Sequence, residues 1–414
     1  MQDIISTQGE IFASVGASNG AVAAEGVVKT EVPAVQPLVR RFMPELDVLR
    51  GIAVLGVLFF HGFRSEYGSL PFTGIRKTLV FATQAGAFGV NLFFVLSGFL
   101  ITGILLDSRN RADYYRRFYT RRALRILPAY YSLLILLALL HQASPAFLGL
   151  SFIYLSNVVS LFGVGNSYHP LWSLAVEEHY YIVWPAVVHK LKPRHLGMVA
   201  LAICILIPLA RAISFHYGHL AGLDWFTWFA ADGLAAGSLL ALVLRTPISR
   251  KQATNLAIFL LTLSAILLLA GSNFGILSRQ TRILGASIQL TLVNSFFAGL
   301  LVLLLLVGSG PRKNLVKSAI LQFFGYISYG LYLIHPLIFR LYDVATRRLL
   351  PSLVPSVDNF SLIVLRFGVV GCVAVGLAFI SRKYYEEWFL KLKECVAPPT
   401  ETTGKTAIQS LGPN

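Results

Sequence analysis

The fold is decided by one stretch of the chain, Glu45-Leu-Asp-Val-Leu-Arg-Gly-Ile-Ala-Val-Leu-Gly-Val-Leu-Phe-Phe-His-Gly-Phe63. It is nearly apolar from Gly51 to Phe60, yet Arg50 precedes this run and His61 follows it. Eleven residues separate the two, which at ~3.6 residues per turn places them on one helix face, about 16 Å apart along the axis. A cation and an imidazole on one face of a membrane helix favour a functional site. A hydrogen bond from His61 to a neighbouring helix is the alternative.

The apolar character extends along the whole chain. Of its 414 residues, 56% are hydrophobic and 13% are charged, and the mean hydropathy is +0.68. Soluble domains carry about 25% charged residues, whereas successive apolar runs of around 20 residues are typical of a polytopic membrane protein. The net charge of +16 collects between these runs, as the positive-inside rule describes, so we expect no nucleic-acid partner. The three scattered cysteines have no metal-ligand spacing, and we predict no metal site.

Ten segments are predicted to span the membrane: 46–64, 79–106, 126–143, 169–190, 197–216, 226–245, 254–272, 284–307, 319–341 and 360–382. An eleventh apolar piece, 147–163, is shorter and is interrupted by glycines. If it does not cross, the basic loops 107–125 and 190–195 lie on the same side as all the others; if it crosses, the later loops move to the opposite side. The first arrangement obeys the positive-inside rule throughout. We therefore predict an all-α protein of about ten transmembrane helices with both termini cytoplasmic, and a segment 144–168 that is re-entrant or interfacial.

The two ends of the chain differ from this central part. Residues 1–43 are predicted to be a flexible cytoplasmic extension, residues 44–390 the membrane domain, and residues 391–414 a disordered cytoplasmic tail rich in Pro, Thr and Gly. The first 28 residues contain acids but no Lys or Arg, so we do not expect a signal peptide.

Ionisable side chains inside the predicted spans are candidate functional groups, because they are costly in a bilayer. The predicted orientation places Asp47 and Arg50 near the cytoplasmic boundary and His61 beyond the midplane. The outer half holds further ionisable groups: Glu177, Glu178, His179, Asp232 and His335, with Trp172 near its outer edge. A carboxylate orients an imidazole and supports its charged form, so this set suits proton transfer. Structural hydrogen bonding is the alternative for Asp232 and His335.

Three polar positions need a choice between interpretations. Glu177 and Glu178 face about 100° apart on a helix, so one of them is expected to enter the core, and we favour Glu177. Asn91 and Ser97 lie in an aromatic span. No nucleophile-elbow pattern surrounds Ser97, so packing or substrate lining is favoured over a nucleophilic role.

Arginines gather in Phe118–Pro128, at the inner end of the third span. Arg122 and Arg125 are i, i+3 neighbours, and Arg121 and Arg125 are i, i+4 neighbours. Guanidinium groups bind phosphates well, so these residues are candidates for holding an anionic donor. Anchoring at the cytoplasmic membrane surface is the alternative.

Six segments together resemble a known family. They are Leu46-Asp-Val-Leu-Arg-Gly-Ile-Ala53 followed by His61 at Arg-x10-His spacing, Asn91–Gly103, Phe118–Pro128, Leu171-Trp-Ser-Leu-Ala-Val-Glu177, Asp232-Gly-Leu-Ala-Ala-Gly237, and Tyr326-Ile-Ser-Tyr-Gly-Leu-Tyr-Leu-Ile-His-Pro336. In this order they resemble the membrane-bound acyltransferase 3 family, whose members O-acylate glycans, nodulation factors and some macrolides. The resemblance runs from about residue 44 to 390. It implies transfer of an acyl group, often acetyl, from cytoplasmic acyl-CoA to an acceptor hydroxyl at or beyond the membrane.

The resemblance also implies roles for single residues. His61 is the implied catalytic residue, and Asp47 and Glu177 match motif positions whose roles it does not separate. The donor side is assigned to Arg50, Arg122, Arg125 and Arg121. The substrate path is assigned to Asn91, Ser97, Trp172, Asp232 and His335. We expect acetyl-CoA as a donor substrate rather than a permanently bound cofactor, a glycan or other glycosylated acceptor, and a location in the bacterial inner membrane.

The expected mechanism joins both ends of the first span. The phosphates of CoA contact the inner arginines, the pantetheine arm follows the first helix, and the thioester lies near His61. His61 either acts as a general base or carries the acyl group briefly; the base is preferred, since it needs only reach and a suitable pKa. A transporter or flippase of a glycan-lipid is the alternative, because buried charges also serve proton coupling, although no internal repeat is visible.

Overall fold

The computed structural model describes residues 38–40, 43–219, 222–278, 281–311, 313–356 and 359–396. These residues form helices and connecting turns, and none of them lies in a strand. All of them belong to one compact unit, Pro37–Asn414. Most of the predicted N-terminal extension lies outside the described residues, and so does the predicted tail beyond Val396.

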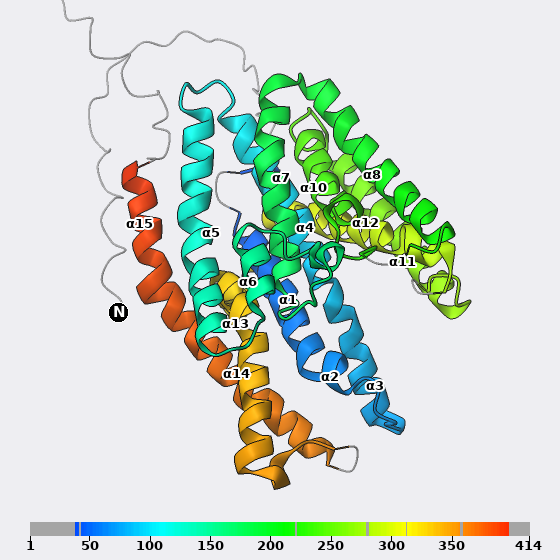
Figure 1. Cartoon of the computed structure of the whole chain (residues 1–414). Coiled ribbons are helices and arrows are strands. Elements are labelled where there is room, and N and C mark those ends of the chain that lie inside the picture. Colours follow the sequence, from blue (N-terminus) through cyan, green and yellow to red (C-terminus); the bar gives the residue numbers. More distant parts are fainter. Residues whose placement is uncertain are drawn as a thin grey trace, which may run out of the picture. The chain divides into compact units, whose positions relative to one another are not determined.

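The described residues form a bundle of α-helices joined by short helical connectors (Figure 1). The α-helices are α1 (Pro44–Phe59), α2 (Ser65–Tyr67), α3 (Gly74–Ala82), α4 (Gly89–Asp107), α5 (Tyr114–Leu139), α6 (Pro145–Phe152), α7 (Leu171–Lys190), α8 (Pro193–His216), α9 (Thr227–Ala230), α10 (Asp232–Val243), α11 (Arg250–Asn273), α12 (Ile283–Gly308), α13 (Ala319–Leu349), α14 (Phe360–Ile380) and α15 (Glu387–Val396). The π-helical connectors are η1 (Phe60–Arg64) and η6 (Ser381–Glu386), and the 3-10 connectors are η2 (Thr83–Phe88), η3 (Val159–Phe162), η4 (Lys313–Val316) and η5 (Pro351–Leu353).

Seven continuous helical stretches are long and apolar enough to cross a membrane: Pro44–Arg64, Gly74–Asp107, Tyr114–Leu139, Pro193–His216, Arg250–Asn273, Ile283–Gly308 and Phe360–Leu392. The outer faces of α8 and α11 carry exposed leucines and isoleucines, such as Leu206 and Ile266, as expected for helices that contact lipid. The other predicted spans correspond to α7, α9 with α10, and α13. The all-α membrane architecture is thus confirmed, whereas the count of ten spans and the orientation of the termini stay predictions.

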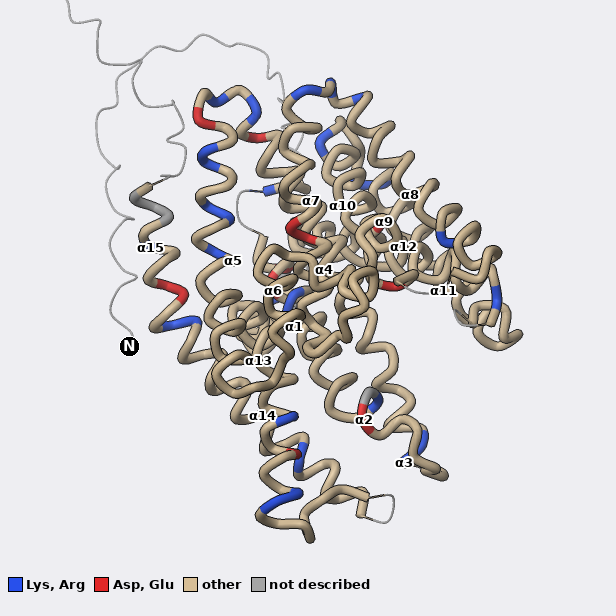
Figure 2. The backbone as a smooth tube through the Cα atoms, viewed as in Figure 1, with Lys and Arg blue, Asp and Glu red and all other residues tan. Residues whose placement is uncertain are grey.

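The basic residues have a consistent position in the bundle. Figure 2 shows Lys and Arg at the end where α5 begins and, at the same end, between α7 and α8. Both connections are arginine- or lysine-rich in the sequence and were assigned to one side of the membrane. Because both basic connections lie at the same end of the bundle, the structure supports their assignment to one side of the membrane.

A close helix crossing brings α1 against α13. A Cβ atom added at Gly51 would lie 2.1 Å from the carbonyl oxygen of Leu321, and one added at Gly325 would lie 2.0 Å from that of Asp47. Small residues at a crossing let two backbones approach, the usual means by which membrane helices associate. This crossing fixes the part of α1 that carries Arg50.

The first span changes its winding at His61. Helix α1 ends at Phe59 and continues as the π-helix η1 through Phe60–Arg64. A π-helical turn inserted in an α-helix is rare and is frequent at functional sites. His61 therefore lies in a locally rewound turn that the apolar pattern of the sequence did not reveal.

The segment before α7 contains no helix long enough to span the membrane. Its α-helix, α6, has eight residues, which at ~1.5 Å per residue measures about 12 Å, against a hydrocarbon core of about 30 Å. The tyrosines Tyr130 and Tyr131 of α5 donate hydrogen bonds to the carbonyl oxygens of Ser151 and Phe152, at 2.7 and 3.1 Å. The segment is thus fastened to the flank of α5, in agreement with the re-entrant or interfacial prediction.

The C-terminal boundary differs from the predicted one. Residues 391–396 continue α15 to Val396, and α15 packs beside α5 (Figure 1). This helix is strongly amphipathic, with Trp388 exposed on one face. Residues 391–396, predicted as part of the tail, thus belong to this helix.

Candidate active site

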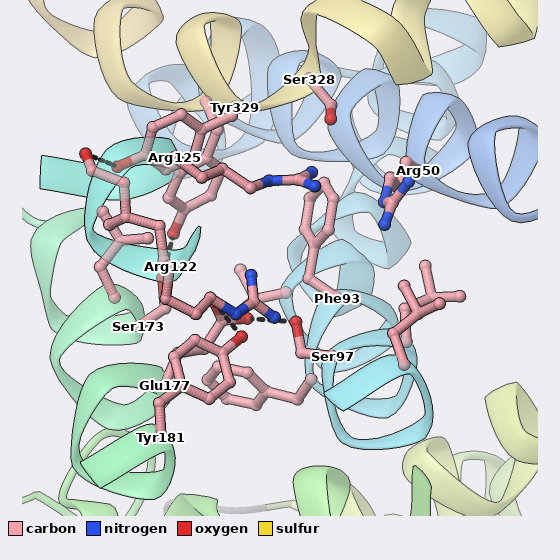
Figure 3. Close-up of a pocket in the computed structure, with 17 residues that line it drawn as sticks. Arg50, Phe93, Ser97, Arg122, Arg125, Ser173, Glu177, Tyr181, Ser328 and Tyr329 are labelled. Atoms are coloured by element: carbon pink, nitrogen blue, oxygen red, sulfur yellow. Dashed lines mark hydrogen bonds between the residues drawn. The ribbon is translucent and has the colours of Figure 1, made fainter. Parts of the chain in front are cut away.

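Two neighbouring cavities lie beside α1, and the first is lined by arginines. This arginine cavity has a volume of about 100 Å³ and is bounded by α1, α4, α5, α7 and α13. Arg50, Arg122 and Arg125 extend their guanidinium groups toward the same space (Figure 3). A space of this size holds several water molecules, so it has room for a phosphate group or part of a slender chain.

The arginines of this cavity are unequally neutralised. Arg50 forms an ion pair with Asp47, whose Oδ1 lies 2.6 Å from the Nη1 of Arg50. The guanidinium carbon of Arg122 lies 4.5 Å from the ring centre of Tyr181, a cation–π contact. Within the described part of the chain, neither Arg122 nor Arg125 forms a salt bridge. The cavity is therefore lined by three arginines and one carboxylate, Glu177, and this excess of positive charge suits an anionic ligand.

Glu177 is the acidic residue of the arginine cavity. Its Oε1 accepts a hydrogen bond from the hydroxyl of Ser97 at 2.9 Å, and its Oε2 accepts one from Tyr181 at 3.2 Å (Figure 3). Glu177 lines the cavity, whereas Glu178 is outside the lining set. The preference for Glu177 agrees with this geometry. Ser97 lines the same cavity, where its hydroxyl donates to this carboxylate.

The second cavity contains the imidazoles. This histidine cavity has a volume of about 220 Å³, and among its lining residues are His61, Gln84, Asn91, His169, Trp172 and Asp232. Val90, Phe94 and Tyr332 line both cavities. The arginine cavity and the histidine cavity are therefore neighbours that share one wall, and together they follow α1 from Arg50 to His61.

His61 contacts a second histidine, His335 of α13. The Nδ1 of His61 lies 3.0 Å from the carbonyl oxygen of Val57 and 3.2 Å from the Nε2 of His335. The Nδ1 of His335, which is fully buried, lies 2.8 Å from the carbonyl oxygen of Leu331. A carbonyl oxygen only accepts, so each Nδ1 carries a hydrogen in this arrangement. The Nε2 of neutral His61 is then the unprotonated nitrogen.

Two buried polar pairs form the far wall of the histidine cavity. The Oδ2 of Asp232 accepts from the Nη2 of Arg211 at 2.5 Å and from the hydroxyl of Thr291 at 2.7 Å. Asn91 donates to the Oδ1 of Asn294 at 2.9 Å. Asp232 thus forms a buried ion pair with Arg211, a contact that a structural role would use.

The predicted site residues fall into three groups. The arginine cavity holds Arg50, Ser97, Arg122, Arg125 and Glu177, and the histidine cavity holds His61, Asn91, Trp172 and Asp232. His335 lies behind His61. The third group, which lines neither cavity, consists of His335, Asp47 and Arg121. Asp47 pairs with Arg50, and Arg121 is on the same helix as Arg122.

Several site residues were absent from the sequence-based set. Arg211 is a cation inside a predicted span, so the rule that identified His61 also applies to it. Tyr332 and Tyr329 lie in the quoted segment 326–336 and line the arginine cavity. His169 lines the histidine cavity from the connection before α7. It is the first residue of the predicted span 169–190, so the same rule applies to it.

The comparison with known proteins assigns the chain to a family. A family model described as an acyltransferase domain matches residues 43–382. The chain belongs to this acyltransferase family. The match confirms the resemblance drawn from the six segments, and with it an acyltransferase domain in this chain.

Curated relatives are O-acetyltransferases. The chain is 33% identical over 167 residues to the peptidoglycan O-acetyltransferase OatA of Listeria monocytogenes, covering 36% of this chain and 24% of that protein. It is 28% identical over 264 residues to the O-acetyltransferase OatA of Staphylococcus aureus (55% and 40%), and 35% identical over 166 residues to the putative peptidoglycan O-acetyltransferase YrhL of Bacillus subtilis (35% and 23%). The matches thus cover less than half the length of these relatives, and no solved structure matches the chain significantly.

Proposed function

We propose that this chain is a membrane O-acetyltransferase that moves an acetyl group from cytoplasmic acetyl-CoA to a hydroxyl group of a glycan on the outer side of the membrane. The observation that carries the proposal is the pair of adjacent cavities, one cationic and one with an imidazole pair, along the helix of the Arg-x10-His motif. The relatives named as peptidoglycan O-acetyltransferases favour a glycan acceptor of that class.

The arginine cavity would hold the anionic part of the donor. The cavity of about 100 Å³ would take the phosphates next to the pantetheine arm, and Arg122 and Arg125 supply positive charge there. The adenosine part of the donor would lie toward the basic end of α5. The thioester would reach past Phe94 and Tyr332, the shared wall, toward His61.

His61 would act as the general base. Its Nε2 takes the proton of the acceptor hydroxyl while the acceptor oxygen attacks the thioester carbonyl. The resulting imidazolium keeps its Nδ1 hydrogen on the carbonyl oxygen of Val57 and on the Nε2 of His335, and both partners stabilise the added charge. The carbon–sulfur bond then breaks, and the thiolate takes the proton from His61. The products are an acetyl ester and CoA with a free thiol.

The test is acetyl transfer by the purified full chain in lipid nanodiscs, with labelled acetyl-CoA and a peptidoglycan fragment as acceptor. We expect label in the ester product, and we expect His61→Ala to lower the rate about 100- to 10,000-fold, the usual contribution of a general base. His61→Ala protein must elute and melt like the wild type, which excludes a folding effect.

Retained transfer by His61→Ala would overturn the assignment of the base. Recovery of an acetylated His61 would overturn the preference for base over acyl carrier. If the wild type moves a glycan-lipid across a vesicle membrane and transfers no label, the chain is a flippase instead.

A further inference from the structure

Helix α13 contains a proline beside His335. Pro336 follows this histidine; it has no backbone N–H, and its ring crowds the carbonyl group four residues earlier. The hydroxyl of Tyr168, from the segment before α7, lies at this point. It donates to the carbonyl oxygen of Leu333 at 2.6 Å and accepts from the backbone N–H of Leu337 at 3.2 Å.

The two backbone groups that contact Tyr168 would normally bond to each other. Leu333 and Leu337 are four residues apart, and in an unbroken α-helix this carbonyl accepts from this N–H. A side chain that inserts into the ladder bends the helix at that turn. The turn that Tyr168 enters is the one that contains His335.

Tyr168 is held firmly in this position. Its side chain is fully buried, and the guanidinium carbon of Arg340 lies 5.7 Å from its ring centre. Arg340 also donates to the carbonyl oxygens of Gln142 and Ser167, at 3.0 and 2.9 Å. On the other side of His335, the hydroxyl of Tyr332 donates to the carbonyl oxygen of Pro170 at 3.2 Å. The segment is thus fastened to α13 both before and after the histidine.

We propose that Tyr168 is a positioning residue for the histidine pair. Its hydroxyl bridges the carbonyl oxygen of Leu333 and the N–H of Leu337, and so sets the Nε2 of His335 against the Nδ1 of His61. Tyr168 lies in neither cavity lining, so it acts through His335 and does not touch substrate. This inference rests on the proposed function, in which His61 is the base.

The first test is Tyr168→Phe, which removes only the hydroxyl. A misplacement of about 1 Å at a catalytic site can cost ~100-fold in rate, so we expect kcat to fall at least about tenfold while KM for acetyl-CoA stays within about twofold. Tyr114→Phe is the matched control: the buried Tyr114 hydroxyl donates to the carbonyl oxygen of Pro185 at 2.9 Å, also in a proline-containing helix. We expect kcat of this control to equal that of the wild type.

A double-mutant cycle with His335→Ala separates positioning from general destabilisation. In the His335→Ala background, adding Tyr168→Phe should change the residual kcat by less than about twofold. A fall of equal size in both backgrounds, or an unchanged kcat in Tyr168→Phe alone, would overturn the proposal. If Tyr168→Phe protein does not fold, Arg340→Gln takes its place in the cycle, because it loosens the Tyr168 segment and keeps the hydroxyl.

A spectroscopic readout keeps this inference independent of activity. Nitrogen NMR of histidine-labelled protein, with signals assigned through His61→Ala and His335→Ala, should show both signals displaced by Tyr168→Phe and not by Tyr114→Phe. Displaced signals in a protein that transfers no acetyl group would support the positioning role and refute the proposed function. Unmoved signals in an active enzyme would refute the positioning role alone.

Discussion

Single charged side chains decide what the arginine cavity can bind. We expect Arg122→Ala and Arg125→Ala each to raise KM for acetyl-CoA about 10- to 100-fold, because a hydrogen bond to a charged group contributes roughly 1.5–3 kcal/mol. The value of kcat at saturating donor should change by less than about threefold. Steady-state kinetics of the purified variants measure both parameters.

The matched control for these variants is Arg116→Ala. Arg116 is on the same helix, is exposed, and lines neither cavity, so KM should stay at the wild-type value. An equal rise in KM for Arg116→Ala would show a general effect of charge at the membrane surface. In that case the anchoring interpretation of the arginines, and not the donor site, would be correct.

Also at the residue scale, physics explains which site residues could be predicted from the sequence. His61, Arg50 and Glu177 were found because an ionisable group inside a span is costly and therefore conspicuous. Arg211 satisfies the same rule, although it was not among the predicted site residues. Tyr168 could not be predicted from the sequence. Its role depends on which loop packs against the turn of α13 at His335, and that is a matter of tertiary structure.

At the scale of helices, the crossing of α1 and α13 links stability to the site. We expect Gly325→Ala to lower the free energy of unfolding by about 1–3 kcal/mol, as overpacking usually does, because the added Cβ would lie 2.0 Å from the carbonyl oxygen of Asp47. The melting temperature in detergent should fall by at least ~2 °C. KM for acetyl-CoA should rise as well, since Asp47 holds Arg50.

Helix α14 offers the control for this substitution. An added Cβ at Gly371 has no atom within 4 Å, so Gly371→Ala should leave both the melting temperature and KM unchanged. Equal melting temperatures for the two variants would mean that α1 shifts away from α13 without cost. The position of Arg50 would then not depend on the crossing of α1 and α13.

Helix positions were more predictable than helix ends. Hydropathy located each predicted span in a helical part of the chain. It placed the start of the third span at residue 126, whereas α5 begins at Tyr114. The arginines of this first part lower its hydropathy and leave its helix propensity intact. The π-helical turn at His61 has no hydropathy signal either, because one extra residue in a turn does not change the composition.

At the scale of the whole molecule, the two cavities and the topology depend on each other. The segment before α7 supplies His169 to the histidine cavity and Tyr168 to α13. Both contacts require this segment to lie at the level of His61, at the end of α1 opposite to Arg50. If the arginine-rich start of α5 is cytoplasmic, the histidine cavity faces the outer side, where a glycan acceptor would be found.

The topology can be tested by labelling single cysteines, after the native cysteines have been replaced by serine. We expect Ala146→Cys, on the exposed surface of α6, to react with an impermeant maleimide in intact cells, and Lys192→Cys, between α7 and α8, to react only after the membrane is permeabilised. The physical reason is that α6 is too short to cross and that the basic loops favour one side. Labelling of Lys192→Cys in intact cells would mean that the segment before α7 crosses the membrane. Donor and acceptor sides would then have to be reassigned, since Lys192 and the arginines of α5 would lie on opposite faces.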